Sequence, residues 1–209
     1  MNSDNLIKRS LSTPPERLKV IGCGILQKEV EFLIRKNDWP LDTCFLDSTF
    51  HNNLYLLSES LEKAIVENKK QDLFILYGAC HPLMDRILER HRIFRTEGQN
   101  CIEMLLGAGL FRSEVEGGAF FLLEDWATHW SKVMKTAYGN ANSEIIREIF
   151  ISDRKYFLGV RTPCSDNFES LALGISTDFD VPLCWIDIDL GHFESVLEKA
   201  VHRALEQQQ

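Results

Sequence analysis

The chain alternates between short apolar runs and longer segments with helical periodicity. Apolar runs of strand length occur at residues 17–23 (RLKVIGC), 41–46 (LDTCFL) and 72–77 (DLFILY). Each precedes a segment with helical spacing of its apolar residues: ILQKEVEFLIRKN, LYLLSESLEKAIVENKK, and roughly Pro82–His91. Strands that alternate with helices of this length indicate βαβ units and a parallel sheet. Continuous runs such as LFILY are typical of strands buried on both faces.

The second half continues this pattern less regularly. A weak strand is expected at 93–96, followed by a helix in GQNCIEMLLGAG with Asn100 as its cap and Gly107 beyond its end. The segments AFFLLEDWATHWSKVMKTAYG, SEIIREIFISDR, SDNFESLALGISTDF and HFESVLEKAVHRALEQQQ have helical patterns, and KYFLGV and VPLCWIDIDL are typical of strands. We predict a Rossmann-like three-layer α/β sandwich whose central, mostly parallel sheet has about five or six strands. Residues 17–209 form a single domain in this interpretation, after a polar lead-in at 1–16.

Composition narrows the classes of function. The 209 residues carry 23 Lys and Arg against 31 Asp and Glu, a net charge of −8, which argues against a nucleic-acid partner. No run reaches the ~18 apolar residues of a membrane helix, and the N-terminal residues lack the apolar stretch of a secretory signal. We therefore expect a cytoplasmic protein with reduced thiols, in which cysteines serve as core, catalytic or metal-binding residues rather than as disulfides.

Residues with ligand or nucleophile chemistry follow successive predicted strands. Cys23 closes the first strand, His51 follows the second, Cys80 follows the third, and Cys101 begins the helix after the fourth. They are 28, 29 and 21 residues apart, about one βα unit each. Because ligands bind beyond the carboxyl ends of parallel strands, we expect these side chains to meet in one cleft at that edge of the sheet.

Three sulfur donors and an imidazole suit a zinc ion or an iron–sulfur cluster. The thiolates of Cys23, Cys80 and Cys101 would be stabilised by the helix N-termini that follow them. Gly22, Gly24 and Gly78 would let the backbone approach a bound group. The sequence therefore predicts metal ligation by Cys23, Cys80 and Cys101, with His51 as a fourth ligand or a general acid/base.

Other candidates have competing structural explanations. His81 follows Cys80 directly, so its side chain is expected to diverge and to support the site rather than ligate. Glu103 is either an acid that orients a ligand and takes part in catalysis or a solvated first-turn acid. Asp125 and His129 are spaced for a surface ion pair, and we interpret Trp126 and Trp130 as core residues.

Two further patterns limit the kind of site. A buried cysteine is usually a small apolar residue, which is our interpretation of Cys44, Cys164 and Cys184. The sequence GCGILQ is not GxGxxG, so a dinucleotide site is disfavoured.

Four segments resemble the DUF1638 family: VIGCGILQKEVEFLI, FHNN, LYGACHP and NCIEMLLGAG. Weaker similarity in AFFLLEDWATHW and RKYFLGVRT extends the resemblance over roughly Leu18–Thr162. The family patterns are close to ACGxLxxE, LHNxP and YGxCGxG, and a Cys followed two residues later by Glu. The resemblance adds Asn52 to the cofactor-binding residues, beside Gly22, Gly24, Gly78 and His81.

This sequence departs from the family patterns in two places. Phe50 stands in place of a leucine, and Asn53-Leu54 stands where a proline would follow. His81 and Pro82 replace glycines after the third-strand cysteine, which narrows that loop and adds an imidazole. Some family members are encoded near corrinoid-dependent methyltransferases, so the resemblance implies a role in one-carbon or corrinoid metabolism.

Three hypotheses about function follow. The first is a metalloprotein, expected to be an enzyme, that acts on a small-molecule substrate or cofactor at a centre of three cysteines with one histidine. The second is a metal-free thiol enzyme with Cys80 as the nucleophile and His51 or His81 as its base. The third is an accessory protein that binds a corrinoid protein or cofactor without catalysis. The sequence leaves the reaction, the metal and the oligomeric state open.

Overall fold

The computed structural model describes residues 17–207, with the side chain of His51 excepted; the predicted lead-in at 1–16 and residues 208–209 lie outside this range. Strands and helices alternate in the order β1 (Leu18–Cys23), η3 (Gly24–Leu26), α1 (Gln27–Asn37), β2 (Leu41–Leu46), η4 (Ser48–Asn52), α2 (Leu54–Asn68), β3 (Leu73–Leu76), α3 (Met84–His91), α4 (Cys101–Leu106), α5 (Ala108–Gly117), β4 (Ala119–Leu122), α6 (Glu124–Thr128), α7 (Trp130–Tyr138), α8 (Ser143–Asp153), β5 (Tyr156–Arg161), α9 (Glu169–Phe179), β6 (Leu183–Asp187) and α10 (Gly191–Glu206).

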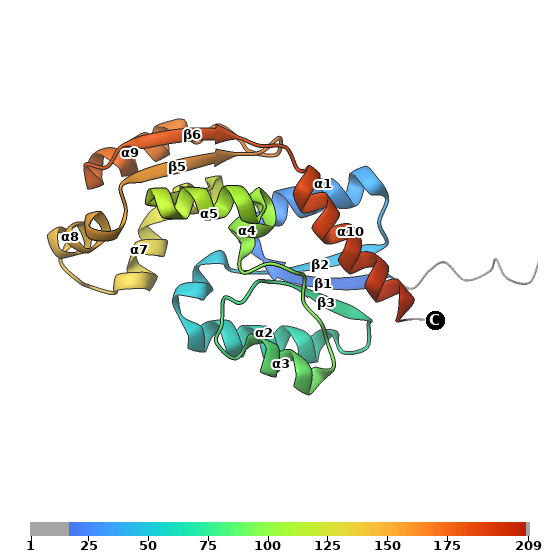
Figure 1. Ribbon diagram of the computed structural model, residues 1–209. Helices are drawn as coiled ribbons and strands as arrows, with labels where there is room; N and C mark the ends of the chain where they lie inside the picture. The colour runs from blue at the N-terminus through green and yellow to red at the C-terminus, as the bar shows by residue number, and fades with distance from the viewer. Residues whose placement is uncertain (1–16, 208–209) are drawn as a thin grey trace, which may run out of the picture.

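The first half of the chain forms a three-stranded parallel sheet in the order β2-β1-β3. Ile21 of β1 is paired with Cys44 on one side and with Ile75 on the other. Helices α2 and α3 lie below this sheet in Figure 1, and α1 and α10 lie above it. The layers are those of a Rossmann-like α/β fold, which confirms the predicted fold class.

A second three-stranded parallel sheet, in the order β4-β5-β6, takes the place of the expected continuation of the first. Beyond β3, the predicted strand at 93–96 is reduced to a single parallel bridge between Ile75 and Arg95. The chain then forms α4 and α5 and starts a new sheet at β4, which pairs with β5 and not with β3. The prediction of one central sheet was therefore wrong, whereas the parallel arrangement of strands was right.

Strand β4 itself was predicted to be part of a helix. Its apolar run, Ala119–Leu122, is paired with β5 along its length and has Ala119, Phe121 and Leu122 buried. Periodicity alone does not distinguish a buried strand from a buried helix in a short continuous apolar run. Here the segment is buried on both faces, which favours a strand.

Side chains of β4 and β5 alternate between two cores. On one face, Phe121 and Leu158 join the core that also contains β1, β3 and α10. On the other face, Leu122 and Phe157 pack with Phe150 in a cluster covered by α6, α8 and α9. The first core is thus continuous between the two sheets, and the prediction of a single domain remains a prediction.

Helix α10 carries the chain from the second sheet back to the first. Its buried face includes Phe193, Leu197 and Val201, each at most 1% exposed, which belong to the core of the first sheet. Arg203 lies over the ring of Phe94, with its guanidinium carbon 4.1 Å from the ring centroid. The first sheet is therefore completed by residues that follow the second sheet in sequence.

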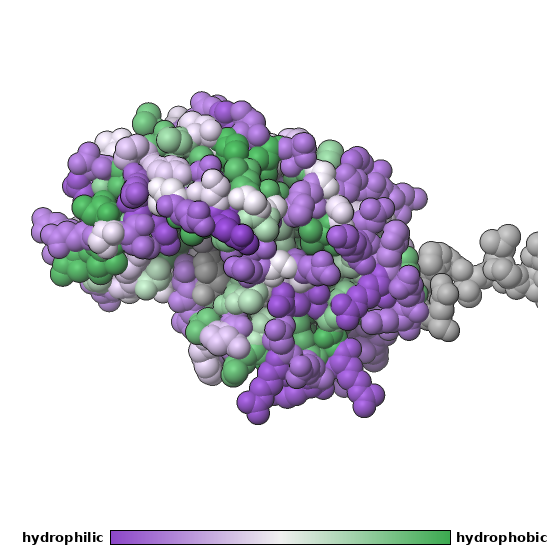
Figure 2. Space-filling model, viewed as in Figure 1, coloured by the Kyte–Doolittle hydropathy of each residue, from purple (hydrophilic) through white to green (hydrophobic). Residues whose placement is uncertain are grey.

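The surface is largely hydrophilic on the face seen in Figure 2, in keeping with the net charge of −8. Hydrophobic side chains gather there over α8, whose Ile145 and Ile149 are about half exposed. Within residues 17–207, no helix combines the length and the apolar character needed to cross a lipid bilayer.

Candidate functional site

The backbone of Gln99 and Asn100 crosses directly over Gly78, at the carboxyl end of β3. A Cβ atom on residue 78 would lie 2.2 Å from the carbonyl oxygen of Gln99 and 2.5 Å from the Cα of Asn100. The amide of Ala79 donates a hydrogen bond of 2.7 Å to that same carbonyl. The predicted close approach at Gly78 is therefore made by the chain's own backbone, and it brings the Cys80 loop against the start of α4.

Side chains around the start of α4 fix the direction of this short helix. The side-chain oxygen of Asn100 accepts a hydrogen bond of 2.9 Å from the amide of Glu103, which confirms Asn100 as the N-cap. The carboxylate of Glu103 accepts from the amide of Gln99 at 3.3 Å. Helix α4 ends at Gly107, whose φ is +79°. Cys101 is thus held as the first residue of a helix capped at both ends.

The thiols of Cys23, Cys80 and Cys101 lie together, as their positions after successive strands predict. Cys101 is hydrogen-bonded to the sulfur atoms of both Cys23 and Cys80, and these bonds, with burial, raise its pKa well above the usual range. The bond from Cys101 is the main cause that lowers the pKa of Cys80 to about 7, against the opposing effect of burial. Cys101 is therefore the protonated donor, and Cys80 is the thiol that ionises near neutral pH.

The hydroxyl of Tyr77 is buried beside this group. Burial, followed by the nearby sulfur atoms of Cys23, Cys101 and Cys80, raises the pKa of Tyr77 well above its usual range. Its oxygen has no hydrogen-bond partner among the described residues. Tyr77 is thus a neutral O–H donor beside the sulfur atoms.

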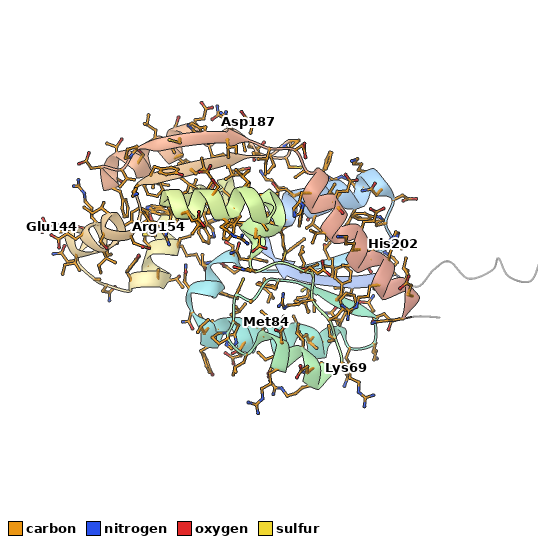
Figure 3. The ribbon with its side chains drawn as sticks, viewed as in Figure 1. Lys69, Met84, Glu144, Arg154, Asp187 and His202 are labelled. Atoms are coloured by element: carbon orange, nitrogen blue, oxygen red, sulfur yellow. The ribbon has the colours of Figure 1, made fainter. Side chains whose placement is uncertain are left out.

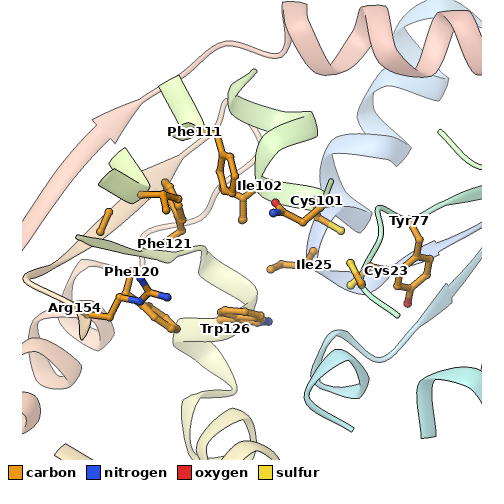
Figure 4. A pocket seen from close by; sticks show the side chains of 14 residues that line it. Cys23, Ile25, Tyr77, Cys101, Ile102, Phe111, Phe120, Phe121, Trp126 and Arg154 are labelled. Atoms are coloured by element: carbon orange, nitrogen blue, oxygen red, sulfur yellow. The ribbon is translucent and has the colours of Figure 1, made fainter. Parts of the chain in front are cut away.

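A pocket of about 290 Å³ opens from the thiols toward the second sheet. Figure 4 shows Cys23, Cys101 and Tyr77 at one end of it and Phe120 with Arg154 at the other. The remaining lining residues are mostly apolar and come from both halves of the chain: Ile25, Cys80, Asn100, Ile102, Phe111, Val115, Ala119, Phe121 and Trp126. The carboxyl end of the first sheet therefore faces a pocket closed on its far side by β4, α5 and α6.

Other predicted site residues lie elsewhere. A Cβ atom at Gly22 would lie 3.3 Å from Leu76, and one at Gly24 would lie 3.1 Å from the carbonyl oxygen of Leu46. These two glycines therefore allow close packing within the protein and do not bring the backbone close to a ligand in this pocket. The ring Nδ1 of His81 accepts a hydrogen bond of 3.0 Å from the amide of Leu83, and His81 is not among the described residues that line the pocket. Its supporting role at the site remains a prediction.

Three further candidates follow β2 or lie on α4. The backbones of His51 and Asn52 lie in η4, directly after β2, and Asn52 is not among the described residues that line the pocket. Glu103 does not line the pocket either, and its carboxylate faces the backbone of residue 99. Catalysis by His51 or Glu103 and ligand binding by Asn52 remain predictions.

The other three cysteines stay outside the thiol group. Cys44 pairs with Ile21 within the first sheet, and Cys164 follows β5, where its amide donates to the hydroxyl of Thr162 at 3.1 Å. Cys184 on β6 is exposed, so its interpretation as a buried apolar residue was wrong. Among the described strands, β6 pairs with β5 alone, which leaves this side chain at an edge of the sheet.

The three sulfur atoms form a chemically suitable donor set for a metal, although they are not arranged around a common point. Among residues 17–207, no three His, Cys, Asp or Glu side chains stand in a metal-ligating arrangement. Cys23 and Cys80 instead both lie close enough to Cys101 to raise its pKa. The three sulfurs are soft donors that can lose their protons. Such a donor set fits zinc or an iron–sulfur cluster once the side chains turn toward one ion.

A second, polar cavity of about 450 Å³ lies on the other side of Ile25, at the carboxyl ends of β1, β4 and β5. Lys28 bridges it with 2.7 Å ion pairs to Glu124 and Asp166. The buried carboxyl of Glu29 accepts a hydrogen bond of 2.7 Å from Thr162, and burial raises its pKa. Sequence patterns gave no signal for these contacts, because they join residues that are 96 to 138 positions apart.

Predictions for the segment around α6 are confirmed in part. Nδ1 of His129 lies 3.4 Å from the carboxylate of Asp125, so the two residues are paired as predicted, and 2.8 Å from the backbone carbonyl oxygen of Asp125. Trp130 packs edge-on against Phe157 in the second core. Trp126 packs against Phe120 at 5.9 Å between ring centroids, but it also lines the pocket, which its interpretation as a core residue missed.

Together these features define a Rossmann-like α/β protein with a group of three thiols at the end of an apolar pocket between two parallel sheets. The family DUF1638, described as a protein of unknown function, matches residues 45–197, and the chain belongs to this family. The matched range contains His51, Cys80 and Cys101, whereas Cys23 precedes it. Neither a curated protein nor a solved structure gives a significant match.

Proposed function

We propose that the protein binds a soft metal centre, a zinc ion or an iron–sulfur cluster, through Cys23, Cys80 and Cys101, and that the adjoining pocket holds the molecule on which this centre acts. The observation that carries the proposal is the convergence of three thiols from three separate segments on one end of a pocket. Thiolates are the ligands that such centres prefer. The cytoplasmic location, where thiols stay reduced, is part of this proposal.

Three sulfur ligands leave one position for His51 or for a bound molecule. An open position next to a pocket is the arrangement of a catalytic centre, whereas a structural zinc site is closed by four protein ligands. A bound metal would supply Lewis-acid or electron-transfer chemistry there. The protein's part is to hold the sulfurs on rigid elements, to keep water away with apolar walls, and to place the neutral Tyr77 hydroxyl beside Cys23.

The decisive experiment is elemental analysis and absorption spectroscopy of protein purified without oxygen. We expect stoichiometric zinc or iron in the wild type and its loss in Cys80→Ser, with an unchanged circular dichroism spectrum, because the buried core does not depend on the centre. Cys184→Ser, an exposed thiol outside the pocket, is the matched control and should keep the metal. Wild-type protein that holds neither metal after anaerobic reconstitution, or equal loss in both variants, would overturn the proposal.

A second candidate function, a metal-free thiol enzyme, is favoured by the position of Cys80. Its thiol is partly exposed at the end of the pocket and accepts a hydrogen bond from the buried Cys101. A thiolate so placed is a nucleophile toward a molecule in the pocket. Unlike the metal centre, this function requires only Cys80 and its donor, so Cys23→Ala would leave it largely intact.

The state of Cys80 gives a pH-dependent prediction for the metal-free, reduced protein. Alkylation of Cys80 by iodoacetamide, followed by peptide mass spectrometry, should rise as the pH increases through neutrality, with a midpoint near the pKa of about 7. In Cys101→Ala the hydrogen bond to the thiolate is lost, so the midpoint should move to higher pH. Modification of Cys184 in the same digest serves as the internal reference. A midpoint that Cys101→Ala leaves unchanged would contradict this assignment.

A further inference from the structure

The wall of the pocket opposite the thiols is apolar and aromatic. The rings of Phe111 and Phe121 are stacked with centroids 5.5 Å apart, and Phe120 is tilted against Trp126 at 5.9 Å. Phe120 is held from behind by Phe150, at 5.1 Å between centroids. Because these rings are fixed by one another, they offer a preformed apolar surface rather than one that must be ordered on binding.

One charged side chain is found among the described residues that line this pocket, and it is Arg154. It follows α8 and is labelled near one end of α5 in Figure 3. Carboxylates are absent from the same set of lining residues. In a protein with a net charge of −8, a pocket with a single guanidinium and no acid selects for an anion.

Among residues 17–207, one acid lies within ion-pair distance of the guanidinium of Arg154, and it does not use all of the guanidinium's hydrogen-bond donors. Its Nη2 lies 3.2 Å from the carboxylate of Asp153, whose side chain is 73% exposed. Exposed pairs of this kind contribute little. Arginine has five N–H donors in a planar fork that matches a carboxylate, so donors remain for a ligand.

We propose that the pocket binds a small, flat organic carboxylate with a largely apolar body. Its carboxylate pairs with Arg154, its body lies against Phe120, Phe121 and Trp126, and its other end reaches the thiols. The volume of about 290 Å³ is at the small end of the range for small-molecule sites, which limits the body to one or two rings. This inference deepens the proposed function, because it names a substrate class for the same site. Binding of the carboxylate does not depend on the proposed function; only its reaction at the thiols does.

The test uses 2-naphthoate and its uncharged counterpart 2-naphthamide as probes, with binding measured by isothermal titration calorimetry. Wild-type protein should bind naphthoate about tenfold more tightly than naphthamide, the size expected for one charge-assisted pair. Arg154→Gln should reduce naphthoate binding to the level of naphthamide and leave naphthamide binding unchanged. Arg112→Gln, on α5 and outside the pocket lining, is the matched control and should behave as the wild type.

A second variant tests whether the probes occupy this pocket. Val115 lines the pocket and is 40% exposed, so Val115→Trp should fill the pocket without disturbing the core. This variant should bind both probes about tenfold or more weakly than the wild type. Equal naphthoate affinity in the wild type and Arg154→Gln, or no saturable binding of naphthoate to the wild type, would overturn the inference. Metal content measured on the same samples keeps the two proposals apart. If the wild type is metal-free but binds naphthoate more tightly than naphthamide, only the proposed metal centre is refuted. If the wild type holds metal but binds the two probes equally, only the proposed carboxylate site is refuted.

Discussion

Replacing Gly78 with alanine should destabilise the protein by about 3 kcal/mol, the upper end of the usual cost of overpacking. The new Cβ would lie 2.2 Å from the carbonyl oxygen of Gln99, and this neighbour is backbone, which cannot rotate away as a side chain could. The segment before α4 must therefore move, and with it Cys101. Urea denaturation measures the loss of stability, and the alkylation midpoint of Cys80 should rise because its hydrogen bond from Cys101 is weakened.

Gly109→Ala is the matched control for this substitution. Gly109 lies within α5, and a Cβ at that position would have no atom within 4 Å apart from its chain neighbours and the backbone of its own helix. Alanine should therefore be neutral or should stabilise the helix by about 0.5–1 kcal/mol. If Gly78→Ala were as stable as Gly109→Ala, with the alkylation midpoint of Cys80 unchanged, the backbone of residues 99–100 would not cross closely over Gly78.

Replacing Phe193 with alanine should cost about 3–5 kcal/mol, the usual range for removing a buried aromatic ring. Phe193 is fully buried on the face of α10 that joins the first core, and the preceding residue, His192, lies next to Gly107 at the end of α4. The substitution leaves a cavity between α10 and the elements that carry Cys101. The change in free energy of unfolding is measured by urea titration monitored by circular dichroism.

Glu198→Ala provides the comparison on the same helix, because Glu198 is exposed and its loss should change stability by less than about 0.5 kcal/mol. A similar small effect for Phe193→Ala would show that α10 is not an integral part of the first core.

The strands around the thiols could be predicted from sequence because the signals are local. Continuous apolar runs mark β1 and β3, and the carboxyl ends of parallel strands meet at one edge, so the convergence of Cys23, Cys80 and Cys101 follows from their positions alone. The division into two sheets could not be predicted, because it depends on β4 pairing with β5 rather than with β3. That choice is made by long-range packing and not by composition.

The far wall of the pocket was missed for a similar reason. Arg154 stands in an ordinary polar segment, SDRK, and nothing in its neighbours marks it as a pocket residue. Trp126 has the spacing of a core residue and does pack as one, while one side of its ring faces the pocket. Residues that line a pocket only because two sheets face each other produce no hydrophobic periodicity in the sequence of either sheet.

The return of α10 to the first sheet has a consequence for how the protein is made. When the ribosome has completed β1–β3 and α4, the apolar surface that Phe193, Leu197 and Val201 will cover is still open, and it stays open while the whole second sheet is synthesised. Proteins generally fold unit by unit as they emerge, and apolar surface left open at that stage invites aggregation. We therefore expect a chain stalled before residue 191 to expose this surface and to bind chaperones that recognise apolar segments.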